Sequence, residues 1–305
     1  MKKLNVICYI RAAGPNVIYQ NISDTILSIN KNINTKYKFY ITTDTKLNKE
    51  KIEEIILNNS LTDKLIEIRV CDESWSKSFN TFFNNFKEKT EYILCSHDDL
   101  IVRTYDFFNI TMNEISGHED EIGWIGFTSD SYYRIHGNPV CQSAREIFCK
   151  DRGSWPCTFE LHNMSPNNYD ESKLDMPKRA CKVPGIFSHF NLIKCSNLEK
   201  IGLCPDWGNY TLLIDEHWSL QTLIKGLWTI WIPNIYYDHP LRYNERTVQG
   251  LQNDGYVTQC FTDYWGINSS GLSDSQIENF CERFPNTNLS FFNKKNTYDY
   301  QYLKN

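Results

Sequence analysis

His97, Asp98 and Asp99 form a compact group of side chains that could bind a metal ion. They follow an apolar run, Tyr92-Ile93-Leu94-Cys95, that reads as a short buried strand. In an open parallel sheet, the carboxyl ends of the strands border the crevice where ligands bind. Because side chains alternate along an extended chain, His97 and Asp99 would face one way and Asp98 the other. The pattern indicates a cation that holds a phosphate; alternatively, Asp98 and Asp99 cap the segment that follows.

A second acidic pair, Asp215 and Glu216, stands at the start of a helical pattern. Apolar residues recur at helical spacing after the pair, at Leu220, Leu223, Ile224 and Leu227. A carboxylate held near the end of a rigid helix could take a proton from a hydroxyl group. The structural alternative is that Asp215 complements the helix dipole and caps free amides.

Strand and helix patterns alternate from the amino terminus up to His97, Asp98 and Asp99. Strands are expected at residues 4–10, 38–42, 65–71 and 92–95. The helices between them carry apolar stripes at Ile22, Ile26, Ile29 and Ile33, at Ile52, Ile55 and Ile56, and at Phe79, Phe82, Phe83 and Phe86. The alternation predicts a parallel, nucleotide-binding-type sheet. There is no Gly-x-Gly-x-x-Gly motif after the first strand and no Walker lysine loop, so dinucleotide-binding and ATPase classes lose their usual support.

Polar residues lie at or just beyond the expected strand ends, on the crevice side of the sheet. They are Arg11, Asp44, Asp72, Lys77 and Asn80. Each could be an ordinary turn or capping residue. Together they line the place where a nucleotide would bind.

The second half of the chain is less regular. Strands are expected at residues 121–128, 185–193 and 228–233, with a short helix at 196–202, and His239 follows the last strand. Residues 130–180 form a long irregular excursion, which in a compact domain usually carries function or stays mobile. Cys141, Cys149 and Cys157 are evenly spaced there, with His162 beyond, but they lack the short-range ligand pairs of structural zinc sites.

Composition indicates a globular protein. The 305 residues are 41% hydrophobic, and a net charge of -5 without a basic patch argues against nucleic-acid binding. The eleven cysteines contain no Cys-x-x-Cys pair, the amino terminus lacks a signal-peptide pattern, and no window is apolar enough to span a membrane. We therefore expect reduced thiols and a cytoplasmic location, and we leave peripheral membrane association open.

Taken in order, several segments resemble the inverting, family-2-type nucleotide-sugar glycosyltransferases of the GT-A fold. Ser78-Phe79-Asn80 precedes the strand that ends in Ser96-His97-Asp98-Asp99, which looks like that family's Asp-x-Asp metal motif. The segment 185–202 is similar to the one before the acceptor-side helix. The segment 215–228 looks like that helix with its closing glycine and aromatic residue, and 232–240 is similar to the strand that carries a metal-binding histidine.

This resemblance implies an α/β fold: a GT-A-type, Rossmann-like mixed sheet flanked by helices, with an irregular insertion and a C-terminal extension. Residues 1–240 would form the catalytic domain, with the insertion at 130–180, and residues 241–305 would pack on the core. The enzyme would move a sugar from a nucleotide-diphosphate donor, a UDP-sugar by preference, to a hydroxyl of a glycan, lipid-linked or protein-linked acceptor. Polysaccharide biosynthesis is the expected setting.

The resemblance also implies roles for individual residues. Asp99 and His239 would ligate Mn²⁺ or Mg²⁺, and His97 would touch the ribose or the water shell of the metal. Asp215 would be the general base, with Glu216 in reserve. The remaining cofactor-binding residues would be Arg11 and Asp44 at the base, Asn80 on the ribose side, and Asp72, Lys77 and Asp98 around the donor.

The sequence departs from the family pattern at three places. His97 replaces the first aspartate of the metal motif, Gln221 or Thr222 replaces the arginine usual in the acceptor helix, and Tyr9-Ile10-Arg11 replaces the usual end of the first strand. Trp124, Trp155 and Trp218 are candidate sugar platforms, although core packing is the simpler expectation for each.

Two other classes stay open. A metal-dependent hydrolase or nucleotidyltransferase could use the same crevice with His97, Asp98 and Asp99 as ligands, and it would release free sugar or pyrophosphate. A non-catalytic carbohydrate-binding protein would bind sugar without metal or nucleotide. The transferase interpretation requires Asp99 and Asp215 to meet across one cleft.

Overall fold

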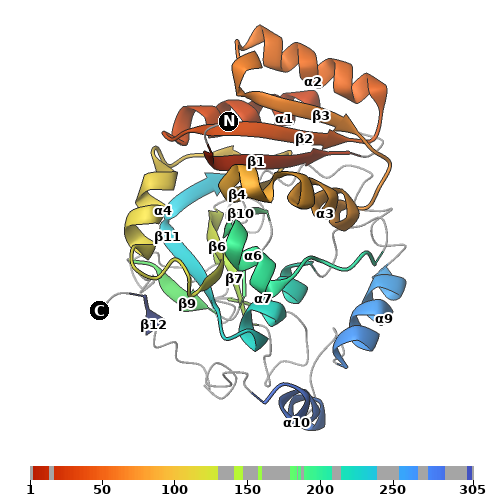
Figure 1. Ribbon diagram of the computed structural model, residues 1–305, viewed down its shortest axis with the longest axis vertical. Coiled ribbons are helices and arrows are strands. Elements are labelled where there is room, and N and C mark those ends of the chain that lie inside the picture. The colour runs from red at the N-terminus through yellow and green to blue at the C-terminus, as the bar shows by residue number, and fades with distance from the viewer. Residues whose placement is uncertain are drawn as a thin grey trace, which may run out of the picture.

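A mixed β-sheet with helices on both faces organises the protein (Figure 1). The computed structural model describes residues 3–13, 17–129, 141–146, 157–159, 179–183, 185–186, 189–207, 214–238, 254–266, 274–285 and 301–303. Its main sheet has the strand order β12-β9-β11-β6-β10-β4-β1-β2-β3, and β5 pairs with β11 at the side.

The first half of the sheet is parallel. Strands β1 (Leu4–Ala12), β2 (Tyr37–Thr43), β3 (Leu65–Val70) and β4 (Thr90–His97) all run in one direction, with β1 between β2 and β4. Nearly every residue of β1 is buried, as expected for a strand covered on both faces. The four strands predicted in this half are confirmed.

Helices cover both faces of the sheet. Alternate residues of β1 point to opposite faces and belong to two different cores. Val6, Cys8 and Ile10 belong to a core formed with α1 (Tyr19–Asn32), α2 (Lys46–Asn58) and α4 (Phe107–Ile115). Ile7 and Tyr9 belong to a second core, formed with α3 (Trp75–Phe86), α6 (Cys195–Ile201) and α7 (Ile214–Ile224). Two short 3-10 turns are η1 (Thr62–Lys64) and η2 (Lys87–Lys89).

The second half of the sheet makes it mixed. Strand β10 (Phe190–Lys194) lies antiparallel between β4 and β6 (Ile122–Ser129). Strand β11 (Trp228–Asp238) is parallel to β6, whereas β9 (Cys181–Val183) and β5 (Ile101–Val102) are antiparallel to β11. The expected GT-A-type mixed sheet is therefore confirmed.

Two strands differ from their predicted extent. The strand expected at 185–193 is shorter and starts at Phe190. The strand expected to end at Pro233 continues to Asp238, because a register irregularity between Ile232 and Tyr236 lets the chain pass the proline and pair again with β6.

The remaining elements lie in or beyond the predicted insertion. Strands β7 (Cys141–Glu146) and β8 (Cys157–Phe159) form an antiparallel pair, and β12 (Gln301–Tyr302) adds to β9. Helices α9 (Asp254–Trp265) and α10 (Asp274–Arg283) lie at the end of the molecule opposite α2 (Figure 1). Cys149, Trp155 and His162 lie outside the described residues, and the domain boundaries stay predictions.

Within the described ranges, no helix is both long and apolar enough to cross a bilayer.

Helix α7 is held between the sheet and helix α9. On the sheet side, Gly123 of β6 faces Thr222, and a Cβ atom added at Gly123 would lie 2.4 Å from Thr222 Cγ2. On the other side, Leu220 and Leu223 pack with Phe261 and Trp265 of α9. α7 can therefore lie this close to β6 only because Gly123 has no side chain.

We expect Gly123→Ala to lower the free energy of unfolding by about 1–3 kcal/mol, since Thr222 would have to move. Thr222→Ala in the same chain should recover most of the loss, because it removes the nearest clashing atoms. Denaturant unfolding of both single variants and the double variant checks the coupling. Additive effects of the two changes would contradict the contact.

His217 gives this packing a pH dependence. Its Nδ1 accepts a hydrogen bond from Trp265 Nε1 at 3.2 Å, and burial lowers the pKa of His217 from 6.5 to about 3. The unfolded chain therefore binds a proton more readily than the folded chain between these two values. Stability should fall as pH decreases below 6.5, with a slope from this group approaching about 1.4 kcal/mol per pH unit.

His217→Asn keeps an acceptor near the Trp265 indole but does not titrate. Denaturant unfolding at several pH values between 5 and 6.5 should give a shallower pH dependence for this variant than for the wild type. Equal slopes would show that His217 is not responsible.

Candidate active site

The acidic group lies where the sheet predicts it, at the carboxyl end of β4. β4 ends at His97, whose backbone N–H donates to the His189 carbonyl at 2.9 Å. Asp98 is 8% exposed and Asp99 is half-buried. Since β1, β2, β3 and β4 are parallel, Arg11, Asp44 and Asp72 share this edge with the acidic pair.

His189 is a member of the site that the sequence did not indicate. Its ring meets that of His97 edge to face, with centroids 4.8 Å apart. His189 directly precedes β10, and because β10 is antiparallel to β4, its beginning lies beside the end of β4. The strand pattern at 185–193 contained no information on direction, so this neighbour could not be identified.

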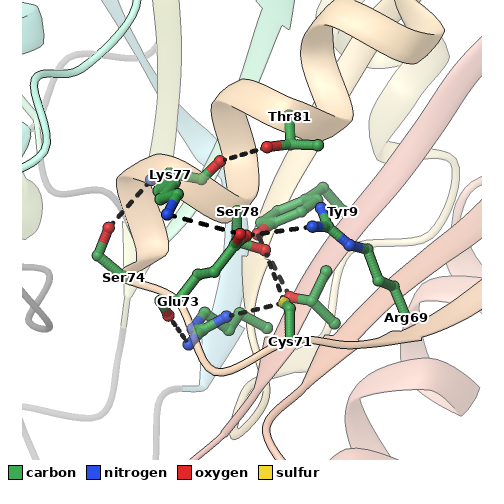
Figure 2. A network of polar contacts seen from close by, with 10 residues as sticks. Tyr9, Arg69, Cys71, Glu73, Ser74, Lys77, Ser78 and Thr81 are labelled. Carbon is green, nitrogen blue, oxygen red and sulfur yellow. Dashed lines mark hydrogen bonds and ion pairs between the residues drawn. The ribbon is translucent and has the colours of Figure 1, made fainter.

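The turn between β3 and α3 holds Arg11. Arg11 Nη1 lies 3.8 Å from Cys71 Sγ, and its Nη2 donates to the Glu73 carbonyl. Figure 2 shows the same turn from close by, with Glu73 between Arg69, at 3.2 Å, and Lys77, at 3.8 Å. Two cationic groups, Arg69 and Lys77, thus lie at the Glu73 carboxylate, and a third, Arg11, binds the Glu73 backbone carbonyl at the predicted donor edge.

A hydrogen-bonded layer beneath this turn fixes it to the sheet. The Tyr9 hydroxyl donates to Ser78 at 3.1 Å, and Ser78 lies 3.4 Å from the Cys71 thiol (Figure 2). All three side chains are buried. Ser78 is therefore a structural link between β1 and α3.

The other predicted donor residues differ in exposure and contacts. Asp72 and Lys77 are exposed, and Asp44 is half-buried and accepts from Asn48 Nδ2 at 2.8 Å. Asn80 Nδ2 donates to the Cys204 carbonyl at 2.8 Å, so Asn80 already carries a structural contact. The roles assigned to these four residues stay predictions.

Asp215 is the second residue of α7, as expected, and is 8% exposed. The side chain of Glu216 lies outside the described part of the chain. Trp218 anchors the helix: it is fully buried, with its ring centroid 5.7 Å from that of Trp124 and 5.4 Å from that of Phe79. Trp124 and Trp218 are core residues, and neither is a sugar platform.

The connection from α7 to β11 favours a position of Asp215 toward the edge that carries the acidic pair. β11 begins at Trp228, which pairs with Ile122 at the start of β6, so the last turn of α7 lies near the amino edge of the sheet. α7 is 11 residues long, which corresponds to about 16 Å. Its first turn therefore points back toward the carboxyl edge.

Cys204 supports this placement. Burial raises the pKa of the Cys204 thiol well above its usual range, and the neighbouring Cys95 and Asp215 raise it further. Cys95 belongs to β4, two residues before His97. Asp215 and Cys95 thus both lie in the surroundings of the Cys204 thiol.

The end of β11 lies beside the segment that follows the acidic pair. Asp238 is paired in register with Ile101, and Arg103 Nε donates to Asp238 Oδ2 at 2.7 Å. His239 is the next residue and lies outside the described residues. Its predicted partnership with Asp99 is supported by the position of Asp238 alone.

In the described ranges, no three His, Cys, Asp or Glu side chains form a group that could hold a metal ion. The donors at the end of β4 nevertheless suit Mn²⁺ or Mg²⁺, because these ions prefer carboxylate oxygens. In nucleotide sites one or two carboxylates are sufficient, since phosphates and water complete the coordination. Asp99, with Asp98 next to it in the chain, fits such an ion.

Comparison with known proteins shows that solved structures share the fold of this chain. No protein-family model matches the sequence, and no curated protein matches it. The crystal structure of GalNAc-T7 with UDP, GalNAc and Mn²⁺ has a TM-score of 0.60 and 13% identity, over 95% of this chain and 56% of that chain. The mannosyltransferase PcManGT from Pyrobaculum calidifontis, in complex with GDP-Man and Mn²⁺, has a TM-score of 0.55 and 11% identity, over 92% of this chain and 68% of that chain.

The chain thus spans little more than half the length of GalNAc-T7. At these identities the likeness concerns the fold alone. The fold of this protein is a curled mixed sheet flanked by helices, of the GT-A type.

Proposed function

We propose that this protein is a metal-dependent glycosyltransferase that moves a sugar from a nucleotide-diphosphate donor to a hydroxyl group, with inversion at the anomeric carbon. One observation carries the proposal. In a sheet of GT-A type, the acidic pair Asp98–Asp99 follows the carboxyl end of β4, and the buried Asp215 stands in the first turn of α7, whose connection to β11 favours a position toward the same edge. The acceptor would be a glycan, lipid-linked or protein-linked hydroxyl.

On the donor side, Arg11 and Asp44 would hold the base, and Asn80 and His97 would lie near the ribose. Asp72 and Lys77 are exposed beside them and would meet the outer part of the donor. Asp99 and His239 would hold Mn²⁺ or Mg²⁺, which when bound neutralises the charge that develops on the leaving diphosphate. The nucleotides of the two similar structures, UDP and GDP-Man, favour a pyrophosphate-linked donor.

On the acceptor side, Asp215 would accept the proton of the attacking hydroxyl. The acceptor oxygen would then bond to the anomeric carbon from the face opposite the diphosphate, and the bond from that carbon to the diphosphate would break. Because Trp218 fixes α7 in the core, the Asp215 carboxylate is held on a rigid element. Glu216 is the alternative base one residue away.

A thermal-shift panel of UDP- and GDP-sugars, with and without Mn²⁺, tests the proposal as a whole. A donor that binds the folded protein raises the melting temperature, and the rise should require the metal. Product analysis with the donor found in this way then separates transfer from hydrolysis. Free sugar or pyrophosphate as the main product would assign the crevice to another reaction class.

Asp99→Asn should weaken Mn²⁺-dependent nucleotide binding by at least about tenfold, which is about 1.4 kcal/mol. Titration calorimetry of UDP and GDP in the presence of Mn²⁺ measures the effect. Glu91→Gln is the matched control, because Glu91 is exposed at the opposite end of the same strand. Unchanged affinity of Asp99→Asn would reject the metal site.

Asp215→Asn should lower the rate of transfer by about 10²–10⁴-fold, the usual contribution of a general base. Donor affinity should remain that of the wild type, since Asp215 acts on the acceptor. Glu216→Gln in parallel decides between the two acids. Full turnover of Asp215→Asn, with loss of turnover in Glu216→Gln, would move the role to Glu216.

A further inference from the structure

The segment from Leu100 to Arg103 is hydrogen-bonded on two sides. Its even residues face α1: Leu100 N–H donates to Thr25 Oγ1 at 3.0 Å, and Val102 N–H donates to Ser28 Oγ at 3.0 Å. Its odd residues face β11: Ile101 pairs with Asp238, and Arg103 N–H donates to the Tyr236 carbonyl at 2.9 Å. This alternation is that of a strand between two partners.

One of those partners is a helix and not a strand. Thr25 Oγ1 also donates to the Leu100 carbonyl at 2.8 Å, and Asn32 Nδ2 donates to the Val102 carbonyl at 2.9 Å. Both backbone groups of Leu100 and of Val102 are thereby satisfied by side chains of α1. The helix replaces a missing strand at this place.

Thr25, Ser28 and Asn32 stand at helical spacing on one face of α1, and all three are buried. They lie among Ile22, Ile26 and Ile29, which pack into the core on the same face of the sheet. Polar side chains inside such an apolar face require partners. Their partners are the backbone groups of the segment that directly follows Asp99.

The same segment reaches the end of β11. Arg103 Nε donates to Asp238 Oδ2 at 2.7 Å, and the Tyr236 N–H donates to Thr104 Oγ1 at 2.8 Å. Asp99 lies immediately before the segment, and His239 follows its partner Asp238. One short stretch of chain therefore links the two places from which metal ligands are expected.

We propose that Thr25, Ser28 and Asn32 of α1 are positioning residues of the donor site. They hold the segment 100–103 and thereby set the position of the Asp98–Asp99 turn relative to the end of β11. This inference rests on the proposed function, since it assigns the turn to donor and metal binding. The three residues touch neither donor nor metal.

The test compares Thr25→Val with Thr25→Ser. Valine keeps the shape of threonine and loses both hydrogen bonds to Leu100, whereas serine keeps the hydroxyl. Calorimetric titration of the full chain with Mn²⁺ plus UDP, repeated with GDP, should show at least about a tenfold weaker affinity for Thr25→Val, the change expected when a binding group is misplaced. Thr25→Ser should stay within about twofold of the wild type, because it retains the hydroxyl that makes these bonds.

Thr111→Val in α4 is the matched control. Thr111 is also fully buried on a helix of the same core, but its hydroxyl donates to the Phe107 carbonyl of its own helix, at 2.8 Å. Thr111→Val should leave the affinity for Mn²⁺ plus nucleotide unchanged. Equal affinities for Thr25→Val and the wild type, with lowered melting temperatures of both valine variants, would overturn the proposal by showing a purely structural role.

Two further measurements keep the test decisive. If Thr25→Val does not fold, Ser28→Ala takes its place, because it removes the bond from Val102 N–H and a bond within α1 to the Thr25 carbonyl but leaves both bonds to Leu100. Amide hydrogen exchange of the segment 98–104 should be faster in either variant, and unchanged exchange would overturn the proposal. Failure of the wild type to bind Mn²⁺ with nucleotide overturns the proposed function itself, whereas wild-type binding that is lost in Asp99→Asn and kept in Thr25→Val overturns this inference alone.

Discussion

The antiparallel course of β10 determines where the functional residues can meet. Strand β10 fills the gap between the parallel strands β4 and β6, and its hydrogen bonds to both fix its direction. The chain must therefore enter β10 at the edge where β4 ends, which brings His189 beside His97. α6 then returns the chain to that edge, where Asn80 bonds to Cys204. A later passage, the end of β11, reaches the segment that follows the acidic pair.

Burial of polar groups is the second constraint at this edge. An unpaired N–H or C=O group inside a protein costs about 1–3 kcal/mol. The segment after Asp99 lies between α1 and β11, so its backbone groups need partners on both sides. Thr25, Ser28 and Asn32 meet this requirement on one side and β11 meets it on the other. The turn that carries the acidic pair is thus fixed by hydrogen bonds within the protein.

Apolar periodicity was sufficient to predict β1 to β4, the helices between them and the place of Asp215, because local burial sets those patterns. It could not reveal His189 or the Arg103–Asp238 ion pair, since each depends on strand direction and on contacts between distant segments. The sequence analysis did not single out Thr25, Ser28 and Asn32, because only the structure shows that their partners are backbone groups of the segment after Asp99. The assigned roles of Asp44, Asp72 and Lys77 remain predictions, whereas Asn80 acquires a structural contact that the sequence did not suggest.

Different contacts hold the two acidic groups in place. Hydrogen bonds hold the Asp98–Asp99 turn, whereas side-chain packing holds the helix of Asp215. The Asp98–Asp99 turn depends on hydrogen bonds from α1 and β11, whose partners all lie before residue 240. Asp215 instead stands on a helix that is packed on one side against Trp124 and Phe79 and on the other side, through His217, against Trp265 of α9. Among the described residues beyond 240, Trp265 of α9 therefore helps to set the position of the proposed base. We expect changes at the contact between His217 and Trp265 to alter the position of Asp215.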